Sequence, residues 1–273
     1  MPEGFEDLPR RLLSGLVLGA VATAAIIFGA LWFALFVSVI VGVMAWEYRS
    51  ILTSNDGGFW RRDLFFPLLV ALCPMIAHVE GELTPALLLL AGAAIATAGI
   101  ERGEGRDWRW TTPGLVLLGS AGACLVVLRA QPLYGLETVV WLVAVVVATD
   151  VGGYFAGRLL GGPKLAPVLS PKKTWAGLVG GVTLAALVGA WFSAATSGTY
   201  FEEVSLVSMV AAVVAQGGDL AESAVKRRFG VKDSSGLIPG HGGALDRFDG
   251  LLAATLVAAA VTFARGKEVF ASW

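Results

Sequence analysis

Residues 223–249 read SAVKRRFGVKDSSGLIPGHGGALDRFD, a polar segment between two apolar stretches of a very hydrophobic chain. The segment holds eight charged side chains, one His and five Gly. In or beside a bilayer every polar group must be paired or solvated, so a dense cluster of charges is costly unless it handles a polar ligand. We therefore expect the chemistry of this protein in and around this segment.

The composition around the segment is that of an integral membrane protein. The 273 residues are 56% hydrophobic and only 15% charged, whereas soluble domains carry roughly 25% charged residues. The mean hydropathy is +0.74. The net charge is −1 and the basic residues stand in short clusters between apolar runs, which argues against nucleic-acid binding.

Nine apolar runs predict membrane-spanning helices, although the third is short. They cover approximately residues 12–28, 31–46, 64–76, 85–100, 113–128, 138–155, 175–195, 204–228 and 250–264. The predicted fold class is an all-α, polytopic membrane helix bundle with about nine transmembrane helices. We expect about five helices in residues 1–135, and the C-terminal helices with the catalytic motif in residues 136–273.

The distribution of Lys and Arg orients the bundle, because these residues accumulate on the cytoplasmic side. With the N-terminus in the cytoplasm, 17 of the 20 Lys and Arg residues fall inside, and only Arg129, Arg265 and Lys267 fall outside. The first apolar run continues to Trp46 without a polar break, which favours a retained helix over a cleaved signal peptide. We expect the charged segment to face the cytoplasm.

The predicted helix that leads into the charged segment, residues 204–228, carries a polar stripe. Gln216, Asp219, Ser223 and Lys226 follow one another at spacings of three and four, with Glu222 beside them. Asp219 lies about 10 Å deeper than Lys226 along the axis, so it must be paired, protonated or bound to a cation. One interpretation is a structural ion pair from Asp219 or Glu222. The other is a Mg²⁺ site beside a nucleotide, since carboxylates near phosphate-binding cations hold that ion.

The loop after this helix and the start of the next helix add further charged groups. They are Lys232, Asp233, His241, Asp246, Arg247 and Asp249. Asp246 and Asp249 are three residues apart, and either stabilise the N-terminus of their helix or contact a ligand. The turn at 239–243, PGHGG, favours ligand contact, because its small residues let backbone N–H groups approach an anion. A single His cannot define a metal site.

A third polar segment, residues 161–174, reads GGPKLAPVLSPKKT and enters the seventh predicted helix. Ser170 is a natural N-cap and Pro171 a natural first helical residue. Lys172 and Lys173 would then stand in the opening turn, where a bound phosphate would offset the unfavourable macrodipole. With Thr174 they would form an anion site. The alternative is the ordinary positive flank of a membrane span.

Asp150 stands late in the sixth apolar run, before Gly152 and Gly153. It either lines the same polar cavity or pairs with Arg158 or a lysine. The sequence leaves both interpretations open.

These segments together resemble the phosphatidate cytidylyltransferases, the CDP-diacylglycerol synthases. The pattern S-x-x-K-R-x4-K-D…P-x-H-G-G-x-x-D-R-x-D is met without a gap between Ser223 and Asp249. The likeness extends to residues 218–223, 150–157 and 170–174, so it covers roughly the C-terminal half. Two positions depart from the family pattern: Ala176 stands where relatives often have Glu or Gln, and Ser235 where many have Gly.

The resemblance implies a membrane enzyme that uses CTP, phosphatidic acid and Mg²⁺, releases pyrophosphate and CDP-diacylglycerol, and is often a homodimer. It implies a bacterial cell (inner) membrane with the active site facing the cytoplasm. The expected metal ligands are Asp219, Asp246 and Asp249; three acidic groups exceed what one Mg²⁺ usually takes, which leaves room for a second cation. The expected catalytic residues are Asp219, Asp246, Lys173 and Lys226. The expected substrate-binding residues are Ser170, Lys172, Lys173, Thr174, Ser223, Lys226, Arg227, Lys232, His241 and Arg247.

Other functions compete with this one. A CTP-dependent lipid kinase or a CDP-archaeol-type synthase would use related chemistry on a different lipid. An ion-coupled secondary transporter would be expected to show structural repeats and a site near the bilayer midplane, whereas here the polar groups gather on one side.

Overall fold

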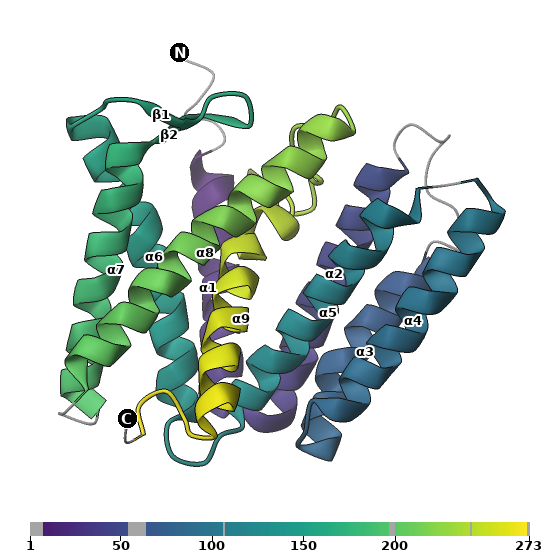
Figure 1. Ribbon diagram of the computed structural model, residues 1–273, viewed down its shortest axis with the longest axis horizontal. Coiled ribbons are helices and arrows are strands. Elements are labelled where there is room, and N and C mark those ends of the chain that lie inside the picture. Colours follow the sequence, from purple (N-terminus) through teal and green to yellow (C-terminus); the bar gives the residue numbers. More distant parts are fainter. Residues whose placement is uncertain (1–7, 54–63, 106, 197–199, 241, 272–273) are drawn as a thin grey trace. The chain divides into compact units, whose positions relative to one another are not determined.

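The computed structural model describes residues 8–53, 64–105, 107–196, 200–240 and 242–271, with the backbone alone for 8–11. Within these ranges the chain forms nine α-helices and one β-hairpin (Figure 1). Seven of the helices are long and apolar enough to cross a membrane. The predicted all-α membrane bundle is confirmed, and the short third run is a helix of 16 residues.

The elements follow one another as α1 (Leu8–Phe28), α2 (Ala30–Leu52), α3 (Phe65–Glu80), α4 (Thr84–Gly103), α5 (Trp108–Arg129), α6 (Gly135–Leu159), β1 (Lys164–Ala166), β2 (Ser170–Thr174), α7 (Trp175–Thr196), α8 (Phe201–Arg228) and α9 (Leu245–Arg265). They divide into two compact units. The first comprises residues 1–127 and 228–248, so that α1 to α5 group with the motif loop, which is the segment 229–244 between α8 and α9. The second comprises residues 128–227 and 249–273.

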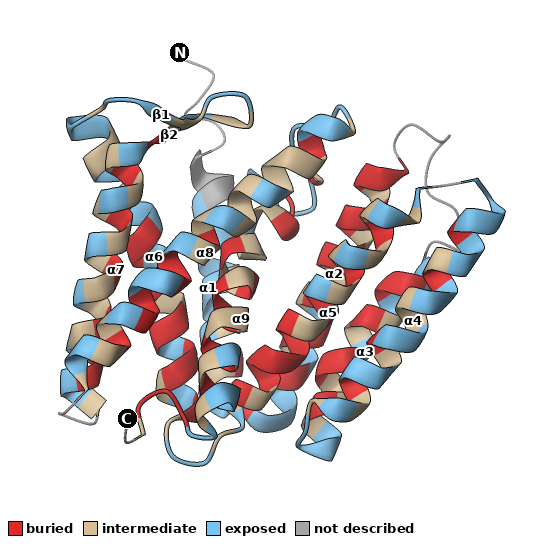
Figure 2. Cartoon of the chain, viewed as in Figure 1, coloured by how far each residue is buried: buried red, intermediate tan, exposed pale blue. Residues whose placement is uncertain are grey.

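Small residues and one buried charge network hold the first unit together. A methyl group added to Gly42 of α2 would lie 2.9 Å from the Cβ of Ala71 on α3, so the two backbones approach closely. The buried Arg49 donates to Glu101 on α4 and, at 3.0 Å, to Thr111 on α5. Buried residues are frequent along α2 and sparse along α4 (Figure 2).

In the second unit α6 packs closely on α7. A methyl group added to Gly181 would lie 2.6 Å from the carbonyl oxygen of Thr149, and one added to Gly152 would lie 2.7 Å from that of Gly180. Only glycine lets the two helix backbones come this near, as is common in membrane bundles. The β-hairpin joins the C-terminal end of α6 to the N-terminal end of α7 (Figure 1).

The entry into α7 differs from the prediction. Ser170 and Pro171 do not start the helix but begin strand β2, in which Ser170 pairs with Ala166 of β1. The cap is Thr174, whose Oγ1 accepts a hydrogen bond from the Gly177 N–H at 3.0 Å. The predicted position of Lys172 and Lys173 in the opening helical turn is therefore wrong. In the strand the two cations avoid the unfavourable end of the helix dipole.

Candidate functional site

Three carboxylates meet where α8 and α9 pack in the second unit. Asp219 and Glu222, one turn apart on α8, and Asp249 of α9 each offer an oxygen, and these oxygens lie within 4.8 Å of one another. All three residues are partly buried. The helices approach because Gly218 has no side chain: a methyl group there would lie 2.8 Å from the Cβ of Ala253. Hard oxygen donors at this spacing suit a divalent cation such as Mg²⁺.

Two lysines neutralise part of this charge. The Lys173 Nζ, on β2, lies 2.5 Å from the Asp219 Oδ2. The Lys226 Nζ, one turn further along α8, lies 2.7 Å from the Glu222 Oε2. Three carboxylates and two ammonium groups leave a formal charge of −1. The cluster therefore attracts a cation while it holds two groups that can donate to phosphate oxygens.

The ion-pair interpretation of the polar stripe on α8 is confirmed, and the metal interpretation stays a prediction. The predicted ion pair between Glu222 and Lys226 is present, and Asp219 pairs with Lys173, a partner from a distant segment. Ser223 lies beside Asp219, its Oγ 3.5 Å from the Asp219 Oδ1. Glu222 was not among the predicted metal ligands, although its spacing of three from Asp219 placed both on one helix face.

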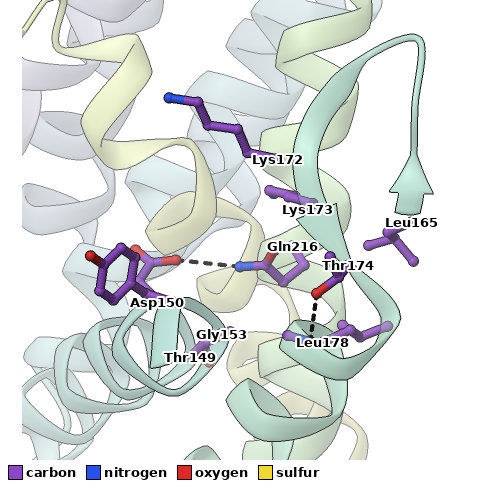
Figure 3. Close-up of a pocket in the computed structure, with 11 residues that line it drawn as sticks. Thr149, Asp150, Gly153, Leu165, Lys172, Lys173, Thr174, Leu178 and Gln216 are labelled. Atoms are coloured by element: carbon purple, nitrogen blue, oxygen red, sulfur yellow. Dashed lines mark hydrogen bonds between the residues drawn. The ribbon is translucent and has the colours of Figure 1, made fainter. Parts of the chain in front are cut away.

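A cavity of about 210 Å³ opens beside this cluster, and Figure 3 shows its lining. Asp150 lines it together with Lys172 and Lys173, as one of the two interpretations of Asp150 expected. The Gln216 Nε2 of α8 donates a hydrogen bond to the Asp150 Oδ1 of α6 at 3.3 Å (Figure 3). Lys173 lines the cavity and also pairs with Asp219, so the cavity adjoins the carboxylates.

The remaining predicted residues of the second unit have different roles. Thr174 is buried and caps α7, so its hydroxyl is engaged in the fold. Ser170 is partly buried within β2, and Arg227 is exposed on the last turn of α8.

The other predicted residues belong to the first unit, in the loop before α9 and in its first turn. Lys232 and Arg247 are exposed. Asp246 holds the loop: its Oδ2 accepts hydrogen bonds from the Ser234 N–H at 3.1 Å, the Ser234 hydroxyl at 3.0 Å and the Gly243 N–H at 3.0 Å. His241 lies outside the described residues.

Glu47 of α2 is a further participant that the sequence analysis missed. It is completely buried, and both of its carboxylate oxygens accept hydrogen bonds from the motif loop and the start of α9. An acidic residue at the end of an apolar run was a signal for a functional role. Its partners stand nearly 200 positions further along the chain, and no local spacing pointed to them.

Comparison with known proteins shows the family of this chain. The chain matches the cytidylyltransferase family over residues 9–264. It is 37% identical to a protein of Brucella suis, with 92% of this chain and 91% of the relative covered. It is 36% identical to a protein of Pseudomonas aeruginosa, with 95% and 98% covered, and 31% identical to one of Bacillus subtilis, with 90% and 94% covered. Each of these relatives is named phosphatidate cytidylyltransferase. This chain belongs to the cytidylyltransferase family.

Proposed function

We propose that the protein transfers CMP from CTP to phosphatidic acid, yielding CDP-diacylglycerol and pyrophosphate for phospholipid synthesis. Relatives with that name match nearly the whole chain. The observation that carries the proposal is the group of Asp219, Glu222 and Asp249 with Lys173 and Lys226 against it. Phosphoryl and nucleotidyl transfer depend on positioning and charge neutralisation, which this group can supply.

We propose Mg²⁺ as the ion that these carboxylates hold. The donor set fits, because all three groups are carboxylate oxygens and their combined charge exceeds that of the two lysines by one. When bound, the ion would neutralise charge on phosphate oxygens. Asp246, whose Oδ2 holds the loop, is proposed as a further ligand. A second cation near the site is part of the proposal.

The lysines are proposed to bind phosphate. Lys173 and Lys226 now pair with Asp219 and Glu222, and an ion on those carboxylates would let the ammonium groups turn to phosphate oxygens. Lys172 on the cavity wall adds a third donor. The other proposed substrate contacts are Ser170, Thr174, Ser223, Arg227, Lys232, His241 and Arg247.

The reaction itself makes few demands on proton transfer. An oxygen of the lipid phosphate attacks the α-phosphorus of CTP, the bond from that phosphorus to the bridging oxygen breaks, and pyrophosphate leaves. A phosphate monoester has a second pKa of about 6 and is largely ionised at neutral pH, so the attacking oxygen needs no general base. The residues of the chain hold both phosphates in line and balance the charge.

We propose that the site opens to the cytoplasm, with the N-terminus on the same side, in a bacterial cell (inner) membrane. The excess of Lys and Arg on that side supports the orientation. A cytoplasmic cavity would admit CTP while the acyl chains of the lipid stay in the bilayer. A homodimer is part of the proposal and is tested by the mass of the detergent-solubilised protein.

The test supplies the purified full chain with CTP, Mg²⁺ and phosphatidic acid in mixed micelles. Label from [α-³²P]CTP should enter the lipid phase, with one pyrophosphate released for each lipid labelled. Label entering instead from [γ-³²P]CTP would identify a lipid kinase, and no label from either would overturn the proposal. A parallel reaction with an archaeal-type ether lipid separates the two classes of acceptor.

A further inference from the structure

A buried carboxylate in α2 ties the middle of the motif loop to the start of α9. One oxygen of Glu47, Oε1, accepts hydrogen bonds from the Ser235 hydroxyl at 2.5 Å and the Ala244 N–H at 3.1 Å. The other, Oε2, accepts from the Ser234 hydroxyl at 3.2 Å and the Leu245 N–H at 2.7 Å. Glu47 is 0% exposed. A single side chain therefore holds the middle of the loop and the point where it enters α9.

The N-terminus of α9 depends on this contact. The helix begins at Leu245, so Ala244 stands at the cap position, where its methyl side chain cannot accept a hydrogen bond. Glu47 accepts the N–H groups of both residues instead, and its negative charge is favourable at a helix N-terminus. Asp246 takes the preceding N–H, that of Gly243. Two carboxylates thus accept three successive N–H groups at the start of the helix.

Gly243 belongs to the same arrangement. A methyl group at this position would lie 2.5 Å from the Glu47 Oε1 and 2.7 Å from its Cδ, and would also collide with the Ser234 hydroxyl. The absence of a side chain thus makes room for Glu47. Ser235, which departs from the family pattern, supplies one of the four donors.

We infer that Glu47 is a positioning residue for the transfer reaction. It contacts no substrate itself. It holds Ser234, Ser235 and the first turn of α9, and this places the groups that the loop and turn carry, among them Lys232, Asp246 and Arg247. The inference rests on the proposed function of these residues. An acceptor for four donors requires a carboxylate, because the amide of Gln would present its NH₂ group to donors.

The test replaces Glu47 by Gln and measures CMP transfer per folded protein. Displacing catalytic groups by about 1 Å can cost about 100-fold in rate, so we expect kcat/KM to fall at least about 100-fold for Glu47→Gln. Most of the loss should fall on kcat, since the phosphate-binding side chains are still present. Glu47→Asp keeps the carboxylate on a shorter side chain and should restore part of kcat.

Glu101→Gln is the matched control. Glu101 is also buried, lies in the same unit and accepts hydrogen bonds from Arg49 and Thr111, but it has no described contact with the motif loop. This variant should lower the melting temperature and leave kcat per folded protein unchanged. Should Glu47→Gln yield too little folded protein, Ser235→Ala, which removes one donor, should give a smaller fall in kcat.

The outcomes separate the two proposals. If the wild-type protein is inactive, the proposed transferase function is overturned, whereas the contact between Glu47 and the motif loop is not. An active wild type together with a fully active Glu47→Gln variant, or an equal kinetic loss in Glu101→Gln, overturns the positioning role alone.

Discussion

Replacing Asp249 by Asn should abolish activity and at the same time make the metal-free protein more stable. The Asp249 carboxylate lies within 4.8 Å of those of Asp219 and Glu222. The two lysines pair with those neighbours, and neither ion pair includes Asp249. At 4.8 Å and an effective dielectric constant of about 20, each like-charge pair costs about 3.5 kcal/mol.

Most of that repulsion is offset by Lys173, Lys226 and solvent. We therefore expect Asp249→Asn to raise the free energy of unfolding without metal by about 1 kcal/mol, or about 2 to 4 °C in melting temperature for a chain of this size. Removing a ligand of the proposed ion should lower kcat/KM for CTP at least about 100-fold. Gain of stability with loss of activity is the signature of a functional site that carries unfavourable charge.

The assay measures melting temperature in detergent with and without Mg²⁺, beside CMP transfer. The wild type should melt at a higher temperature with Mg²⁺, because an ion that binds only the folded state stabilises it, and Asp249→Asn should lose this response. Glu268→Gln is the matched control, because the Glu268 carboxylate of the same unit accepts the N–H groups of Leu133 and Tyr134; it should melt lower and keep the Mg²⁺ response. An Asp249→Asn protein that remains active, or that melts lower and still responds to Mg²⁺, would refute the reasoning.

Three further changes test other parts of the structure. Lys173→Met removes the cation 2.5 Å from Asp219. Because the pair is partly exposed, the free energy of unfolding should change by less than about 1 kcal/mol. Steady-state kinetics should show a higher KM for CTP and a lower kcat. Asp246→Asn should lower the rate of CMP transfer at least about 100-fold. It should also lower the free energy of unfolding by about 1 to 2 kcal/mol, because the Asp246 Oδ2 holds the loop. Full activity of this variant would show that Asp246 is not part of the site. Gly181→Leu should destabilise by at least about 1 to 3 kcal/mol, because a Cβ there meets a backbone oxygen of α6 at 2.6 Å. Gly92→Ala, with nothing within 4 Å, should be neutral or stabilising in the same thermal melt.

The sequence was sufficient to predict the structure where neighbouring residues carry the signal. Apolar runs predicted the helices found in the described residues, because a membrane-spanning helix satisfies its own backbone and needs no partner to be recognised. The polar stripe on α8 also followed from helical spacing, and the structure places Asp219 and Glu222 on one face. The first helical residue of α7 was misplaced because Ser170 and Pro171 form a good local helix-start signal. In the structure the pairing of Ser170 with Ala166 in a short β-hairpin overrides that signal.

The contacts that the sequence did not reveal are those between remote segments. Lys173 and Asp219 are 46 positions apart, and Glu47 and Ser234 are 187 apart. Such partners are set by how helices pack, and in a membrane the packing is decided by small residues such as Gly218 and Gly42 rather than by an apolar stripe. Hydropathy therefore predicts that the helices exist and says little about which side chains meet.

Four of the described carboxylates fall into two pairs that their hydrogen-bond donors distinguish. Glu47 and Asp246 accept backbone N–H groups and serine hydroxyls, donors fixed by the fold that cannot turn to a ligand without unravelling the loop. Asp219 and Glu222 pair with lysine ammonium groups at the ends of flexible side chains, and these can exchange a carboxylate for a phosphate at little cost in structure. A site that must take up an ion and a triphosphate together requires movable lysine donors where the ligands bind. Backbone and serine donors, which the fold fixes, hold the structure that supports such a site. On this ground we propose that Asp219 and Glu222 hold the ion together with Asp249, and that Glu47 sets the shape of the motif loop.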